Sequence, residues 1–136
     1  MKTLTLEGDI TSADTRTQLT TQGSVTAPSL VTPADITKIT GVFIAATTEG
    51  LVAGAQSFFV RIGGNAVKNG EQVIAVSAVG YIAPQAGSDS APQLMVPIVL
   101  NDLDIECGPS DTVSVSVEGA GTDTGSGRAI VTLVFA

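Results

Sequence analysis

The sequence predicts an all-β protein, folded as an antiparallel β-sandwich of about eight strands. Two segments near the C-terminus carry the clearest pattern. In residues 112–118 polar and apolar side chains alternate strictly, so three valines share one face of a strand. Residues 129–135 form a second strand that is apolar on one face and largely apolar on the other. The hydrophobic fraction of 43%, with four Phe, one Tyr and no Trp, indicates a core of small, mostly β-branched side chains.

Further strands follow the same alternation along the chain. Gly8-Asp9 is expected to form a turn after the first strand, and Gly41 breaks the alternation and predicts a β-bulge. Pro97 interrupts an otherwise apolar run that we expect to be a buried strand with an edge or a bend at the proline. The expected strands are residues 2–7, 36–47, 57–62, 72–79 and 94–100, in addition to the two above.

The chain is expected to form one domain, residues 1–136, because neither half could close a core alone. Residues 1–33 are expected to be partly an extended N-terminal arm or edge strand. The polar, threonine-rich segment 11–21 leaves two interpretations open. It is either an edge strand of the same sandwich or an arm that lies on a neighbouring subunit.

Charge and hydropathy exclude two classes of partner. Thirteen acidic and six basic residues give a net charge of -7, and the basic residues are scattered, so direct nucleic-acid binding is not expected. The longest apolar run, residues 42–46, is far shorter than the roughly 20 residues of a membrane-spanning helix. Only 14% of residues are charged, against about 25% in ordinary soluble domains, which is compatible with a surface that contacts other subunits.

The residue types favour a protein that is not an enzyme. The chain has no His, which excludes Ser-His-Asp and Cys-His catalysis, and Cys107 has no positive neighbour in sequence to activate it. Asp123-Thr124-Gly125-Ser126 matches the short motif of aspartic proteases. Glycines precede this motif and little chain follows it, so we interpret it as a connection. No catalytic residue and no cofactor are expected.

Three carboxylates form the one candidate metal site. Asp102, Asp104 and Glu106 are spaced two apart, so on an extended strand all three side chains would project from one face. Oxygen-rich clusters of this kind bind calcium, although the spacing is not that of an EF-hand loop. The other interpretation is an acidic strand rim in solvent.

The connection between the last two strands determines how they are related in space. Residues 119–127 are too many for the common two-residue hairpin turn. We therefore expect the chain to cross between the two sheets here. Backbone pairing between Val115 and Leu133 is then predicted to be absent, because the two strands would face each other across the core.

In its pattern of strands the chain resembles the single jelly roll of viral capsid and other virion proteins. Two pieces carry the resemblance: the turn into a late strand at residues 105–113, and the apolar strand at residues 131–136. The resemblance implies a single jelly roll and a location in the virion. Capsid proteins that bind a single-stranded genome usually have a basic arm, which this acidic chain lacks. The lack of a basic arm implies that another component holds the genome, or that this chain decorates the exterior.

The resulting functional expectation is a structural virion protein, a capsid or capsid-decorating subunit, that self-assembles through its β-sandwich surfaces. The expected partners are further copies of the chain or other virion proteins. The outward apolar residues Phe59, Ile130 and Val134 are the candidate subunit contacts. The alternative is a ligand- or calcium-binding β-sandwich module that uses the three carboxylates.

Overall fold

The structure is a computed structural model that describes residues 2–10, 16–21, 30–49, 57–77, 93–94, 97–120 and 126–136. These residues form strands and connections and contain no helix, which confirms the predicted all-β class. In chain order the strands are β1 (Lys2–Ile10), β2 (Arg16–Gln18), β3 (Leu30–Val31), β4 (Lys38–Glu49), β5 (Ser57–Gly63), β6 (Gln72–Ser77), β7 (Gln93–Leu94), β8 (Ile98–Leu100), β9 (Ile105–Glu106), β10 (Thr112–Ala120) and β11 (Ser126–Phe135).

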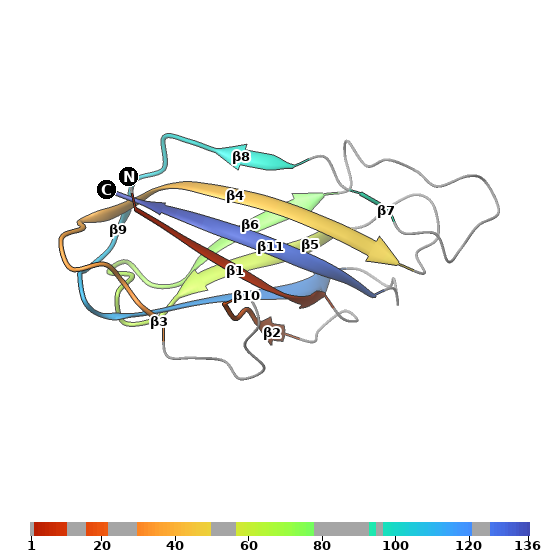
Figure 1. Cartoon of the computed structure of the whole chain (residues 1–136), viewed down its shortest axis with the longest axis horizontal. Coiled ribbons are helices and arrows are strands. Elements are labelled where there is room, and N and C mark those ends of the chain that lie inside the picture. The colour runs from red at the N-terminus through yellow and green to blue at the C-terminus, as the bar shows by residue number, and fades with distance from the viewer. Residues whose placement is uncertain are drawn as a thin grey trace.

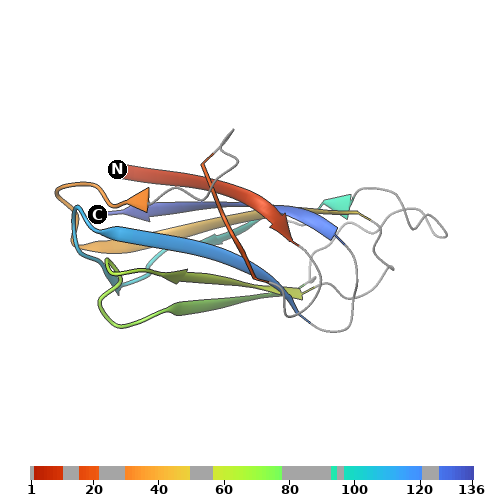
Figure 2. The same ribbon diagram turned by 90° about the horizontal axis from the view of Figure 1, so that it is seen from below.

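The strands form two antiparallel sheets stacked as a β-sandwich, seen as two layers in Figure 2. The six-stranded sheet has the order β1-β11-β4, and β7, β8 and β9 all pair with the free side of β4. The five-stranded sheet has the order β10-β5-β6, with β2 and β3 on the other side of β10. The sandwich predicted from the alternating segments is therefore confirmed.

The strand pairings are nested along the chain. β1 pairs with β11, β2 and β3 pair with β10, β4 pairs with β7 to β9, and β5 pairs with β6. Two further pairings, β4 with β11 and β5 with β10, join these pairs into the two sheets. The chain is thus arranged like one long hairpin folded over on itself, and its two ends lie side by side (Figure 1).

The core lies between the sheets and is built by the inward faces of the strands. β10 and β11 contribute alternate residues from opposite sheets, because β10 pairs only with β2, β3 and β5, and β11 only with β1 and β4, among the described strands. The predicted absence of Val115–Leu133 pairing is therefore confirmed. The buried hydrophobic residues of these two strands are Val113, Val115, Val117, Ala129, Val131, Leu133 and Phe135.

Gly8 and Asp9 do not form the expected turn, because β1 continues through them to Ile10. Gly8 pairs with Ala129 on β11, and its lack of a side chain leaves space that the Leu19 side chain occupies. A Cβ at Gly8 would lie 2.7 Å from Cδ2 of Leu19, whose side chain is fully buried in this space. The glycine permits a close approach between two segments, which the local sequence does not reveal.

In the described residues of the apolar run 94–100, the edge expected at Pro97 is present, but the strand that follows is not buried on its outer face. β7 ends at Leu94, and β8 begins at Ile98, directly after the exposed Pro97. Val99, in the middle of β8, is 52% exposed. β8 lies at the edge of its sheet, where the backbone of a proline is tolerated and one face meets solvent.

The bulge expected at Gly41 is present one residue earlier. Val134 pairs with Gly41 and the next residue, Phe135, pairs with Ile39, so Thr40 is the extra residue. Its hydroxyl donates to the backbone oxygen of Val134 (3.4 Å), and its own backbone oxygen accepts from Leu103 (2.9 Å).

The N-terminal segment contributes strands to both sheets. β1 pairs with β11 along its whole length, and β2 is an edge strand of the five-stranded sheet, paired with β10. Of the two interpretations of segment 11–21, residues 16–18 therefore follow the edge-strand one. Residues 11–15 and 22–29 lie outside the described residues.

Candidate functional site

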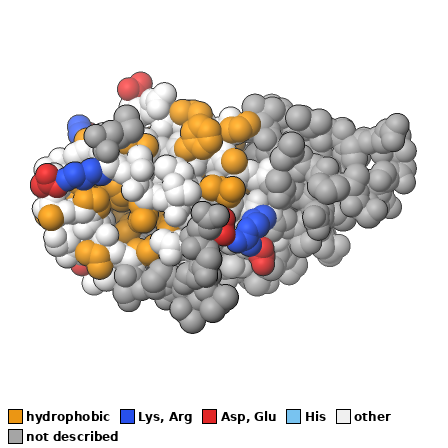
Figure 3. Space-filling model, viewed as in Figure 1, with side chains coloured by type: hydrophobic (Ala, Val, Ile, Leu, Met, Phe, Trp, Pro, Cys, Tyr) orange, Lys and Arg blue, Asp and Glu red, His pale blue; other side chains and the backbone are white. Residues whose placement is uncertain are grey.

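The outer face of the six-stranded sheet carries a group of apolar side chains that the core does not use. Val99, Ile130 and Phe43 are 52%, 42% and 41% exposed. Figure 3, which views this sheet from outside, shows hydrophobic side chains gathered over β4, β8 and β11. We define the apolar face as the outward side chains of Phe43, Ala45, Val99, Ile130 and Val134.

Strand register makes these residues neighbours although they are far apart in sequence. Phe43 on β4 lies opposite Val99 on β8 and opposite Thr132 on β11, so the three form one row across the sheet. Ile130 lies opposite Ala45 in the adjacent row on the same face. Directly opposite residues in antiparallel strands are within side-chain contact, so the rows form a continuous surface.

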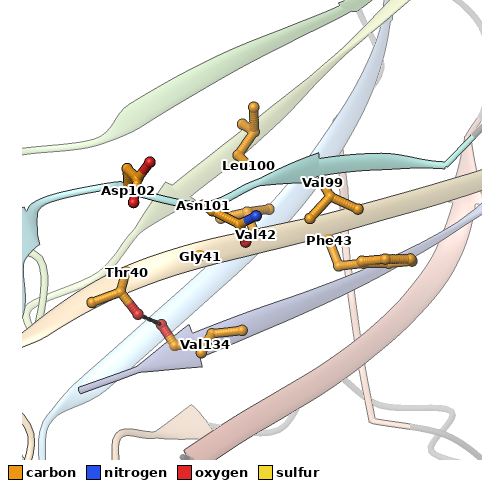
Figure 4. A pocket seen from close by; sticks show the side chains of 9 residues that line it. All are labelled: Thr40, Gly41, Val42, Phe43, Val99, Leu100, Asn101, Asp102 and Val134. Carbon is orange, nitrogen blue, oxygen red and sulfur yellow. Dashed lines mark hydrogen bonds between the residues drawn. The ribbon is translucent and has the colours of Figure 1, made fainter.

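A shallow groove of about 410 Å³ crosses this face. It is lined by side chains of β4, β8 and β11 and by the residues that follow β8 (Figure 4). Gly41 has no side chain, which leaves the groove open between Val134 and the β8 edge. Asn101 and Asp102 provide polar groups at one end of an otherwise mainly apolar lining.

Polar and charged groups border the apolar face. Arg128 binds Glu7 (Nη2–Oε1 2.8 Å) and Asp9 (Nη1–Oδ1 2.9 Å) at the end of the face next to Ile130. These two carboxylates raise the pKa of Arg128 by hydrogen bonding, so its charge is retained. The hydroxyls of Thr5 and Thr132 form a hydrogen bond of 2.9 Å on the same face. An apolar surface with a polar border is typical of a protein interaction site.

The structure brings together two of the three candidate contact residues. Ile130 and Val134 both lie on the outer side of β11. Phe59 lies on the outer face of the other sheet, where the Arg61 guanidinium is 5.6 Å from its ring centroid. Arg61 also binds Glu71 (3.4 Å) and Glu118 (3.2 Å), so that face presents paired charges around Phe59.

Phe43 and Val99 belong to the apolar face but were not singled out from the sequence. Phe43 alternates with the buried Val42 and Ile44, which is a usable sign that it points outward. Val99 lies in an almost continuous apolar run that predicts a buried strand, so no alternation is visible there. The position of Pro97, which is typical of an edge strand, was the available signal for one solvent face.

The three carboxylates proposed as a calcium site do not form a common cluster. Asp102 has a φ of 47°, so the backbone bends there and strict strand alternation does not extend to it. Asp104 lies 3.8 Å from the ammonium group of Lys38, and Glu106 belongs to β9. Within the described ranges no three His, Cys, Asp or Glu side chains are close enough to hold a metal ion.

Cys107 is buried in the core cluster and is 2% exposed. Burial raises the pKa of its thiol, and the nearby charge of Lys68 only partly opposes this effect. The thiol therefore stays neutral at moderately alkaline pH, and a neutral buried thiol is a poor nucleophile.

We expect a soluble maleimide or disulfide reagent at pH 8 to modify Cys107 at least about tenfold more slowly in the folded chain than in chain unfolded in urea. The rate is measured by mass spectrometry or by release of a coloured thiol. Equal rates would show that the thiol is accessible and would contradict the burial.

The protease-like motif at Asp123-Thr124-Gly125 lies outside the described residues, and Ser126 begins β11. Among the residues that are described, no helix is long and apolar enough to cross a membrane. No protein-family model matches the chain, and no curated protein matches it.

Proposed function

We propose that this chain is a structural subunit of a virion, in the capsid or decorating it, and that it self-assembles through the outer surfaces of its β-sandwich. The observation that carries the proposal is the apolar face on β4, β8 and β11. Exposing such a surface is unfavourable in water, and covering it with another subunit removes the cost. The proposal assigns no catalytic step, no cofactor and no direct contact with nucleic acid.

The order of the strands supports a jelly roll. If β2 and β3 occupy one strand position, and β7, β8 and β9 another, eight positions remain. The nested pairing of first with last, second with second-last and so on is the pairing of a folded-over hairpin. A folded-over hairpin split between two sheets is typical of the jelly rolls of viral capsids and other proteins, so the strand order supports this part of the proposal.

The composition of the surface supports assembly over binding of a small charged ligand. Charged residues are few, and many of those described are paired with each other, as in the Arg128 and Arg61 clusters. The charged groups next to the apolar face, Arg128, Glu7 and Asp9, are paired with one another. Association through this face therefore requires little removal of water from charges.

The test compares the wild-type chain with a variant whose apolar face carries two charges, Val99→Lys/Ile130→Lys. We expect the wild type at high concentration to form large assemblies, seen by light scattering and as shells or rings in electron micrographs. The double variant should lose these assemblies, because lysines desolvated in a contact are costly. Both positions are at least 42% exposed, so the fold should remain intact.

Val31→Lys is the matched control. Val31 is, at 58%, the most exposed large apolar residue in the part of the chain that the structure describes, but it lies on β3 of the other sheet. The same chemical change there should leave assembly intact. A wild type that remains monomeric at high concentration would overturn the proposal, and a double variant that assembles like wild type would show that the apolar face is not the contact.

A further inference from the structure

The free edges of the two sheets differ in how well they are protected. On one side of the sandwich, the backbone of Glu7 on β1 exchanges two hydrogen bonds with Thr20 (2.7 and 2.9 Å). The next residue inward, Leu19, donates to the backbone oxygen of Val115 on β10 (2.8 Å). The segment after β2 thus links β1 to β10 and closes this side.

The six-stranded sheet is also protected at its other edge. β8 has three residues and follows the exposed Pro97, while β9 has two residues. Between them the backbone bends at Asp102. Short strands, proline and local bends are the devices that prevent an edge from pairing with another chain.

β6 has none of these devices. Its six residues include no proline and no charged side chain, and its register with β5 is unbroken from Gln72 to Ser77. Among the described strands it pairs with β5 alone. Its outward side chains are Val73, which is 50% exposed, and the exposed Ala75. An uncharged, regular edge strand is a template for a further strand.

We propose that β6 pairs antiparallel with β6 of a second copy, which continues the five-stranded sheet from one copy into the next. This inference rests on the proposed self-assembly and names a second contact for it, on a different sheet from the apolar face. A strand edge is complementary to its own copy in antiparallel orientation, because each backbone N–H meets a C=O. The resulting contact is isologous and closes a dimer.

The alternation of side chains restricts the register. A two-fold axis normal to the sheet keeps the outer face of one copy continuous with the outer face of the other. Residues that lie opposite each other must then point to the same face. This requires that one residue of β6 lies opposite the same residue of the second copy. Five residues pair if either Ile74 or Ala75 takes this position, and we choose Ile74 because it brings two outward apolar side chains opposite each other. Val73 then lies opposite Ala75 of the second copy.

Local charge does not oppose this contact despite the net charge of -7. The acidic residue next to β6 is Glu71, and its carboxylate binds Arg16 (3.3 Å) and Arg61 (3.4 Å). The edge therefore presents a neutral surface to its copy, and pairing would also cover part of Val73.

The experiment places like charges opposite each other across the proposed contact. In Val73→Lys/Ala75→Lys, each lysine at 73 would face a lysine at 75, and Val73→Glu/Ala75→Glu does the same with carboxylates. Like charges directly opposite destabilise strand pairing. Each variant alone should raise the dissociation constant of the dimer by about tenfold or more. An equimolar mixture of the two should restore dimers, because lysine then faces glutamate.

The background for this measurement is Val99→Lys/Ile130→Lys, which removes the contact through the apolar face. In light scattering this variant should have twice the mass of one chain, and adding the β6 lysines should reduce it to one chain. Circular dichroism verifies that each variant is folded. If one lysine variant misfolds, the glutamate variant still provides the comparison.

A background variant that is already monomeric at high concentration would overturn the β6 contact, and so would β6 variants that leave the dimer unchanged. The proposed virion function would survive either result if the wild type still forms large assemblies. The two proposals would separate in the other direction if the wild type forms only dimers and the β6 variants abolish those dimers. The edge contact would then stand, and the proposed assembly function would fail.

Discussion

Leu133→Ala is expected to lower the free energy of unfolding by about 3 kcal/mol, within the range measured for leucine truncations in protein cores. Leu133 is completely buried, and its strand β11 lies between β1 and β4. Its side chain points between the sheets. The strands on either side of β11 restrict how far β11 can move to fill the cavity that the truncation leaves. The loss therefore includes both the removed apolar contacts and the space left behind.

Ile130→Ala is the matched control on the same strand. Ile130 points to the outer face and is 42% exposed, so its truncation should cost less than about 1 kcal/mol. Unfolding in urea is followed by far-ultraviolet circular dichroism, because the chain has no Trp to report by fluorescence. Dilute protein is used, so that assembly does not add to the apparent stability. Equal losses for the two variants would contradict the assignment of the inner and outer faces of β11.

Gly64→Ala should be the second strongly destabilising change, with an expected loss of about 3 kcal/mol. Gly64 has a φ of 98°, which an alanine adopts only with strain. A Cβ here would also lie 2.6 Å from the backbone oxygen of Thr112 and 2.9 Å from Cα of Val113. Both neighbours belong to the backbone of β10, so the turn has to move. Such movement would disturb the hydrogen bond from Ala66 N to Thr112 O (2.8 Å).

Gly70→Ala separates backbone strain from the steric clash. Gly70 has a φ of 84°, but no atom lies within 4 Å of the position of a Cβ. Strain alone should then cost about 1 kcal/mol. Urea unfolding of the two variants measures the difference. Similar losses at Gly64 and Gly70 would show that the turn at Gly64 does not pack against β10 as described.

Most strands could be predicted because alternation is a local property. In β5 the pattern around Phe58, Val60 and Ile62 identifies both the strand and its buried face, and the structure agrees. The separation of β10 and β11 into different sheets could also be predicted, because the length of a connection limits which strands can form a tight hairpin. These conclusions require only the spacing of residues along the chain.

Predictions failed where a residue has a role set by a distant segment. The Gly8-Asp9 pair predicts a turn, whereas Gly8 continues β1 and makes room for Leu19. The apolar run around Val99 predicts a buried strand with an edge or a bend at Pro97, whereas Val99 lies on an edge strand with one face in solvent. The carboxylates at 102, 104 and 106 would share one face only on an extended strand, and a local bend at Asp102 ends the alternation.

The sequence by itself determined the all-β class, the inward and outward faces of the long strands, and the crossing between sheets before β11. The tertiary structure decided which outward faces are neighbours. Phe43, Val99 and Ile130 come from three strands and form one surface only through sheet order and register. That order also leaves β6 paired on one side only, by β5, among the described strands. Alternation assigns a side chain to a face, but adjacency between strands depends on backbone pairing across long distances in sequence, which no local pattern specifies.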